Sequence, residues 1–112
     1  MIKLNKMVLP QEIYDIANAI KDTVPVEKIY LYGSYAYGVP TKNSDYDFYL
    51  VLPDNSKRPL LAVQDAHGAR PKNNTTPIDI IGDYSSNFYR RKDSFRLEKK
   101  IFNEGVVLYE GA

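Results

Sequence analysis

The chain contains no cysteine and only one histidine among its 112 residues. The absence of cysteine excludes disulfides, thiol nucleophiles and thiolate zinc sites, and it suits a reducing compartment. The one histidine, His67, is assigned no role, because a lone histidine in a weakly helical segment is more often a packing or surface residue than a catalyst.

Long apolar runs and an excess of either charge are also missing. No run is long enough to cross a bilayer, and residues 1–6 lack the apolar stretch of a secretory signal. Lys and Arg number 15 against 14 Asp and Glu, so the net charge of +1 does not indicate binding to long nucleic acids. We therefore expect an intracellular, cytoplasmic protein that recognises any nucleotide locally.

The composition is that of an ordinary globular protein, with 44% hydrophobic and 26% charged residues. Its length predicts one domain over residues 1–112. Periodicity and turn formers predict helices over 10–22 and 58–69, a short helix after Ser34, and helical material over 84–103 divided near Asp93. Strands are predicted over 26–31, 45–52, 78–81 and 106–109, with Gly82 ending the third. This alternation predicts an α/β (α+β) fold, a small mixed sheet flanked by helices.

Asp45 and Asp47 are the most informative residues of the chain. On a strand, residues two apart share a face, with Cα atoms about 6.5 Å apart. Aspartate is depleted in strands, and like charges on one face repel unless a cation lies between them. Two aspartates on a solvent-exposed strand face need have no functional role, but the pattern favours a Mg²⁺ site that also binds substrate phosphates.

Two further segments complete the candidate site. Asp79 interrupts the apolar run 78–81, and a neighbouring strand would bring it beside the first pair, although alone it also suits a solvent-facing residue or a loop cap. Gly33 and Ser34 follow a predicted strand, where glycine permits close backbone approach and the start of a helix favours phosphate oxygens. By itself a Gly-Ser pair is usually a turn, so its weight comes from its position.

Three motifs in this order resemble the minimal nucleotidyltransferases of the DNA polymerase β superfamily: GSYAYG at 33–38, SDYDF at 44–48 and PIDI at 77–80. The resemblance extends over most of the chain and implies the polymerase β-like nucleotidyltransferase fold. Many relatives have an arginine where this chain has Tyr37, so a substrate contact made by that arginine does not carry over.

The resemblance implies transfer of a nucleoside monophosphate from a nucleoside triphosphate such as ATP to an acceptor hydroxyl, with release of pyrophosphate. It makes Asp45, Asp47 and Asp79 the catalytic and metal-binding residues, holding two Mg²⁺ ions, with Asp79 also helping to deprotonate the hydroxyl. Gly33 and Ser34 would bind the β- and γ-phosphates for in-line attack.

Stand-alone proteins resembling this one are commonly antitoxins that attach AMP to a tyrosine of a helical HEPN-type toxin. We therefore expect such a partner and a homo- or hetero-oligomer. The alternatives are a transferase acting on a small hydroxylated molecule such as an aminoglycoside, and a noncatalytic antitoxin that neutralises its partner by binding alone.

Two other features have both a functional and a structural interpretation. The chain has ten tyrosines, and those near the motifs could stack on a nucleobase, with Tyr49 the first to test, or could simply fill half-buried sheet positions. Basic residues gather late in the chain and could bind an acidic partner or a polynucleotide, although such runs are usually solvated helical faces. They are Arg90, Arg91, Lys92, Arg96, Lys99 and Lys100.

Overall fold

The computed structural model describes residues 9–111, and the expectation for residues 1–6 lies outside this range. Helices alternate with strands in the order α1 (Gln11–Thr23), β1 (Lys28–Tyr32), α2 (Ser34–Tyr37), β2 (Tyr46–Leu52), α3 (Pro59–Ala69), β3 (Ile78–Tyr84), α4 (Ser85–Arg91), α5 (Arg96–Glu104) and β4 (Val106–Glu110). The predicted α/β class is confirmed, and the helical segment late in the chain divides between Arg91 and Arg96 as expected.

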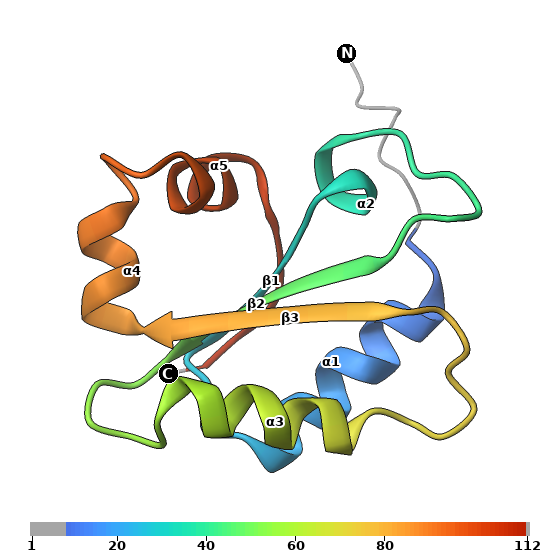
Figure 1. The fold of residues 1–112 in the computed structure, drawn as a ribbon, viewed down its shortest axis with the longest axis horizontal. Coiled ribbons are helices and arrows are strands. Elements are labelled where there is room, and N and C mark those ends of the chain that lie inside the picture. The colour runs from blue at the N-terminus through green and yellow to red at the C-terminus, as the bar shows by residue number, and fades with distance from the viewer. Residues whose placement is uncertain (1–8, 112) are drawn as a thin grey trace.

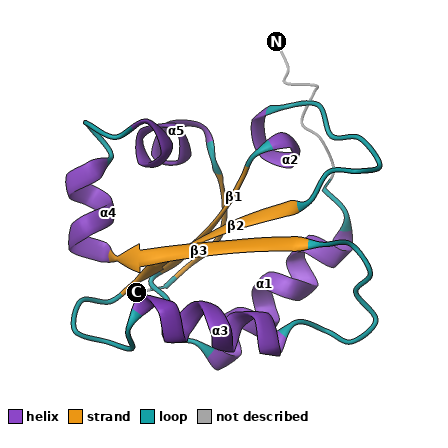
Figure 2. Cartoon of the chain, in the orientation of Figure 1, coloured by secondary structure: helices purple, strands orange, loops and turns teal. Residues whose placement is uncertain are grey.

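The strands form one mixed sheet in the order β3-β2-β1-β4. β2 runs antiparallel to β1 and parallel to β3, and β4 runs antiparallel to β1. Figure 1 shows α1 and α3 on one side of the sheet, whereas α4, α5 and the short α2 lie on the other. Figure 2 shows that the longest loops enter β2 and β3 from the same end of the sheet.

Alternation along β2 divides the core between the two faces of the sheet. Phe48, Leu50 and Leu52 are buried with the apolar residues of α1. Tyr49 and Val51 point the other way and are buried with residues of α4 and α5. Because β2 is central and covered on both faces, its near-continuous apolar run is typical of a buried strand.

Several predicted strand ends differ from the structure: β1 covers 28–32 instead of 26–31, β2 begins at 46 instead of 45, and β4 ends at 110 instead of 109. The largest difference is at the end of β3. β3 does not stop at Gly82 but continues to Tyr84. A Cβ on Gly82 would lie 3.0 Å from the Leu50 carbonyl oxygen, so this glycine allows β3 to approach β2 closely. Asp45 lies just before β2 because the preceding turn, in which the Thr41 N–H donates to Ser44 Oγ at 2.9 Å, ends there.

Among residues 9–111, no helix has the length and apolarity needed to cross a bilayer.

Candidate active site

The site begins where β1 turns into α2. Gly33 has φ +77°, a conformation that favours glycine, and a Cβ at this position would overlap Asp47 Oδ2. The N–H groups of Ala36 and Tyr37 both donate to the Gly33 carbonyl at 3.0 Å, which closes the turn. The structure therefore places the predicted Gly-Ser turn directly against the carboxylate of Asp47.

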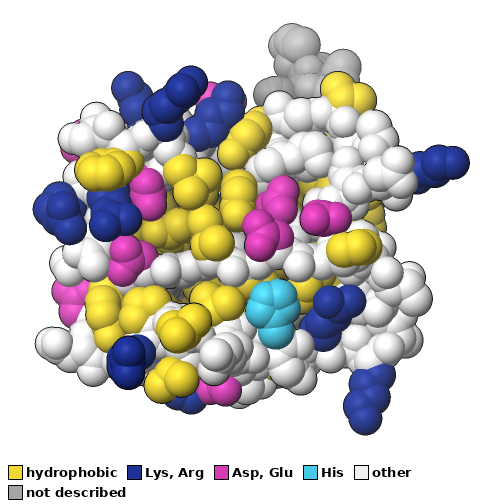
Figure 3. Space-filling model, viewed as in Figure 1, with side chains coloured by type: hydrophobic (Ala, Val, Ile, Leu, Met, Phe, Trp, Pro, Cys, Tyr) yellow, Lys and Arg dark blue, Asp and Glu magenta, His cyan; other side chains and the backbone are white. Residues whose placement is uncertain are grey.

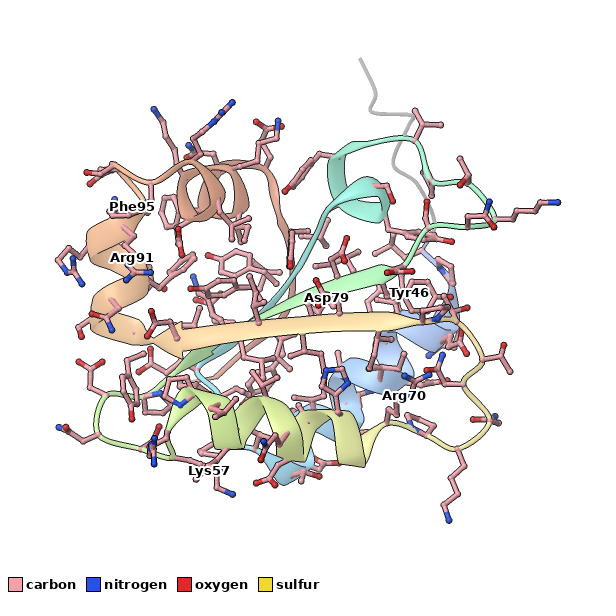
Figure 4. All side chains as sticks on the ribbon, in the orientation of Figure 1. Tyr46, Lys57, Arg70, Asp79, Arg91 and Phe95 are labelled. Atoms are coloured by element: carbon pink, nitrogen blue, oxygen red, sulfur yellow. The ribbon has the colours of Figure 1, made fainter. Side chains whose placement is uncertain are left out.

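Strand pairing brings two of the predicted aspartates together. Asp47 on β2 is the register partner of Asp79 on β3, and it faces Tyr32 on β1. Because the Tyr46 N–H donates to the Pro77 carbonyl at 3.1 Å, the segment containing Asp45 also enters the sheet beside the start of β3. In Figure 4, the Asp79 side chain points to the side of β3 on which α2 lies.

The ionised form of the Asp47 carboxylate is disfavoured in the folded protein. Burial, followed by the negative charges of Asp79 and Asp45, raises the pKa of Asp47 to about 6. None of the ion pairs between residues 9–111 includes Asp45, Asp47 or Asp79. Figure 3 shows acidic side chains gathered near the centre of this face of the molecule. Uncompensated carboxylates of this kind are suited to a bound cation.

The three aspartates are the type of ligand that Mg²⁺ prefers, but their side chains do not form a closed metal site. All three side chains offer hard carboxylate oxygens, which Mg²⁺ prefers, and Asp47 and Asp79 share one face of the sheet. Within the described part of the chain, however, no three His, Cys, Asp or Glu side chains form a group able to hold a metal ion as they stand.

Tyr32 is a neighbour of the site that sequence reasoning missed. Burial, followed by the charges of Asp79 and Asp47, raises the pKa of the Tyr32 phenol far above its usual value. The sequence feature that could have identified Tyr32 is its place as the last residue of β1, immediately before Gly33. Its position beside both aspartates depends on strand register, which the sequence does not reveal.

A polar network behind β2, on the α1 side, was also missed. Glu12 accepts hydrogen bonds from the Tyr46 hydroxyl at 2.8 Å and from the Asn74 amide at 2.7 Å. These bonds, with that of Asn74 the stronger, lower the pKa of Glu12. The network ties α1 and the loop before β3 to the first residue of β2, next to Asp47. It joins residues 62 apart in sequence, so local patterns could not predict it.

Tyr49 does not provide the predicted stacking surface. It shares a face with Asp47, as expected, but it is only 2% exposed and its ring packs 5.1 Å from that of Phe88. Burial and the nearby charges of Glu98 and Asp83 raise its pKa. The structural interpretation, a tyrosine filling the sheet interior, therefore holds for Tyr49.

Residues 13–108 match the family model of the nucleotidyltransferase domain. The chain belongs to this family. The match confirms the predicted membership of the polymerase β superfamily and makes the chain a nucleotidyltransferase. No curated protein sequence matches it significantly.

Among solved structures, this nucleotidyltransferase is similar to a chain in the crystal structure of a toxin-antitoxin with AMP-PNP. The TM-score is 0.53 at 19% sequence identity, over 88% of this chain and 73% of the other. At this identity the similarity shows a shared fold.

The raised pKa of Asp47 predicts how stability depends on pH when divalent metal is removed. Its folded-state pKa of about 6 lies above the ordinary 3.8, so ionisation costs more in the folded state than in the unfolded state. The contribution of Asp47 is therefore most favourable below pH 3.8 and is lost as the pH rises through about 6. After allowance for solvent screening the loss is about 1 kcal/mol.

Chemical denaturation in EDTA, measured across this range for wild type and Asp47→Asn, isolates the contribution. Asp47→Asn is expected to become the more stable protein as the pH rises through about 6. A stability difference between the two proteins that does not vary with pH would contradict the assignment.

Proposed function

We propose that this nucleotidyltransferase transfers AMP from ATP to a hydroxyl group of a partner protein, in a Mg²⁺-dependent reaction. The observation that carries the proposal is the register pairing of Asp47 with Asp79 beside the Gly33-Ser34 turn. Its acidic centre next to a glycine turn offers ligands for a divalent cation and close backbone approach for a triphosphate.

Each residue of the site has a distinct role in this reaction. Asp45, Asp47 and Asp79 would hold Mg²⁺, which would supply positive charge to offset that of the α-phosphate and to lower the pKa of the acceptor hydroxyl. Gly33 and Ser34 bind the β- and γ-phosphates through backbone N–H groups and the serine hydroxyl, orienting the α-phosphate for in-line attack.

The reaction requires no protein nucleophile. Asp79 lies on β3, the edge strand of the sheet, and receives the proton of the acceptor hydroxyl. The acceptor oxygen then forms a bond to the α-phosphorus. At the same time the bond between the α-phosphorus and the oxygen that bridges to the β-phosphate breaks, and pyrophosphate leaves.

The acceptor is a tyrosine of a HEPN-type helical toxin, which makes this chain an antitoxin. Support comes from the similar fold solved in a toxin-antitoxin with AMP-PNP. Apolar side chains exposed on the side of the sheet that α4 and α5 cover also suit a protein partner. On α5 and the turn before it they are Phe95, Leu97 and Phe102, which are 52%, 41% and 39% exposed.

The test uses the full chain, ATP, Mg²⁺ and a protein that copurifies with it. The mass of the partner is expected to increase by one or more AMP units with wild type. Asp79→Asn, which keeps the shape but removes the charge and the proton acceptor, is expected to slow the transfer by at least about a hundredfold.

Asp22→Asn is the matched control, because Asp22 is an exposed residue at the end of α1 and the charge change is the same. It should transfer AMP at the wild-type rate. Transfer to a small hydroxylated molecule but not to the partner would replace the antitoxin assignment. Neutralisation of the partner by Asp79→Asn without any AMP transfer would show a binding module instead.

A further inference from the structure

Lys100 on α5 contacts α2, the short helix that follows Gly33. Its Nζ lies 4.9 Å from the centre of the Tyr37 ring, at the end of α2. An ammonium group at this distance over an aromatic face is attracted by the electrons of the ring. The contact joins residues far apart in the sequence and places a positive charge beside Tyr37, three residues after Ser34.

The segment 33–38 itself contains no cationic side chain. A triphosphate bound there would lie close to Asp47 and Asp79, whose negative charges oppose it. Mg²⁺ offsets part of this repulsion, and the terminal phosphates still require donors with positive charge. Within the described residues, the cation–π contact of Lys100 is the one that brings a cation to α2.

Two other cations on this side of the sheet, Arg91 and Lys92, have partners elsewhere. Arg91 lies 3.7 Å from Asp83 and 3.8 Å from Glu98, within the packed region between β3 and α5. Lys92 lies over the Phe102 ring at 4.8 Å. They are therefore not available to the turn at the end of β1.

Lys100 is free to change partner. Its ion pair with Glu104 spans 3.4 Å between two side chains that are each about half exposed, and such pairs are weak in water. Figure 3 shows further Lys and Arg side chains gathered over α5. A groove of about 240 Å³ on this helix is lined by Arg96, Lys99 and Lys100 together with Asn103 and Glu104, so cations outnumber the one acidic residue there.

We propose that Lys100 is a substrate-binding residue that contacts the terminal phosphates of the nucleoside triphosphate, and that Tyr37 positions it through the aromatic face. The inference rests on the proposed function, because it takes ATP as the nucleotide donor. It assigns the terminal phosphates to a lysine from α5, outside the three sequence motifs.

Binding of ATP and AMP to the full chain in the presence of Mg²⁺ tests this role. Lys100→Ala is expected to weaken ATP binding about tenfold and to leave AMP binding unchanged, because AMP lacks the terminal phosphates. Lys100→Arg keeps the charge and should bind ATP within about threefold of wild type. Lys99→Ala is the matched control, since Lys99 lines the same groove without a contact to the Tyr37 ring.

Two substitutions at Tyr37 test its positioning role. Tyr37→Phe keeps the aromatic face and should bind ATP as wild type does, whereas Tyr37→Ala should weaken ATP binding about threefold. Because Tyr37 acts through Lys100, adding Tyr37→Ala to Lys100→Ala should cause no further loss.

The outcomes separate this inference from the proposed function. If wild type binds ATP and loses it in Asp47→Asn, while Lys100→Ala binds like wild type, only the role of Lys100 is overturned. Equal losses of ATP affinity in Lys99→Ala and Lys100→Ala would show that the effect comes from the overall positive charge of α5. That result would also overturn the specific role of Lys100. A wild type that binds no ATP with Mg²⁺ would overturn both.

Discussion

Asp47→Asn is expected to lower the rate of AMP transfer by at least about a thousandfold, the largest effect of any single substitution in the site. Asp47 is close enough to both other carboxylates for the charges of Asp79 and Asp45 to raise its pKa. Asparagine keeps the shape of the side chain but removes the charge that is proposed to bind the cation.

The rate should be measured under single-turnover conditions with labelled ATP, so that chemistry is separated from product release. Circular dichroism and the denaturation midpoint provide the folding control, and Asp47→Asn should be at least as stable as wild type near neutral pH. A folded Asp47→Asn protein with more than about a tenth of the wild-type rate would rule out the metal-binding role of this residue.

Gly33→Ala is expected to reduce both stability and activity. The φ of +77° disfavours a side chain, and the added Cβ would overlap Asp47 Oδ2, so the carboxylate must move. The expected losses are about 2 kcal/mol in the free energy of unfolding and about a hundredfold in transfer rate, the latter because a displaced ligand misaligns the reacting groups.

Gly68→Ala provides the comparison for this substitution. Gly68 lies within α3, and a Cβ there would meet no atom within 4 Å. Alanine should therefore raise the free energy of unfolding by about 0.5–1 kcal/mol and leave the transfer rate unchanged. Equal activity of Gly33→Ala and Gly68→Ala would show that the approach of Gly33 to Asp47 has no part in catalysis.

Local patterns predicted most of the elements. The apolar spacing of Ile13, Ile16 and Ile20 correctly indicated α1, whose buried face contains all three. The prediction that β3 ends at Gly82 was wrong, because a glycine that ends a strand and a glycine that lets two strands approach have the same sequence signal. The difference depends on the neighbouring strand, here Leu50 of β2, and no local window contains it.

Motif order led to the candidate site, but its geometry required the structure. Alternation placed Asp47 and Tyr49 on one face, yet only the packing of α4 showed that Tyr49 is buried against Phe88. The pairing of Asp47 with Asp79 likewise depends on strand register, which is set across the sheet rather than along the chain. The hydrogen bonds of Glu12 depend in the same way on long-range contacts.

Binding of Mn²⁺ in the presence of ATP, followed by electron paramagnetic resonance, tests the central claim most directly, because Mn²⁺ accepts the same hard oxygen ligands as Mg²⁺. Wild type is expected to bind the metal–nucleotide pair, and the exposed control Asp15→Asn/Asp22→Asn should bind equally well. Asp47→Asn/Asp79→Asn should lose at least about a hundredfold in affinity. Equal binding by Asp47→Asn/Asp79→Asn and wild type would contradict the assignment of these carboxylates as the metal site.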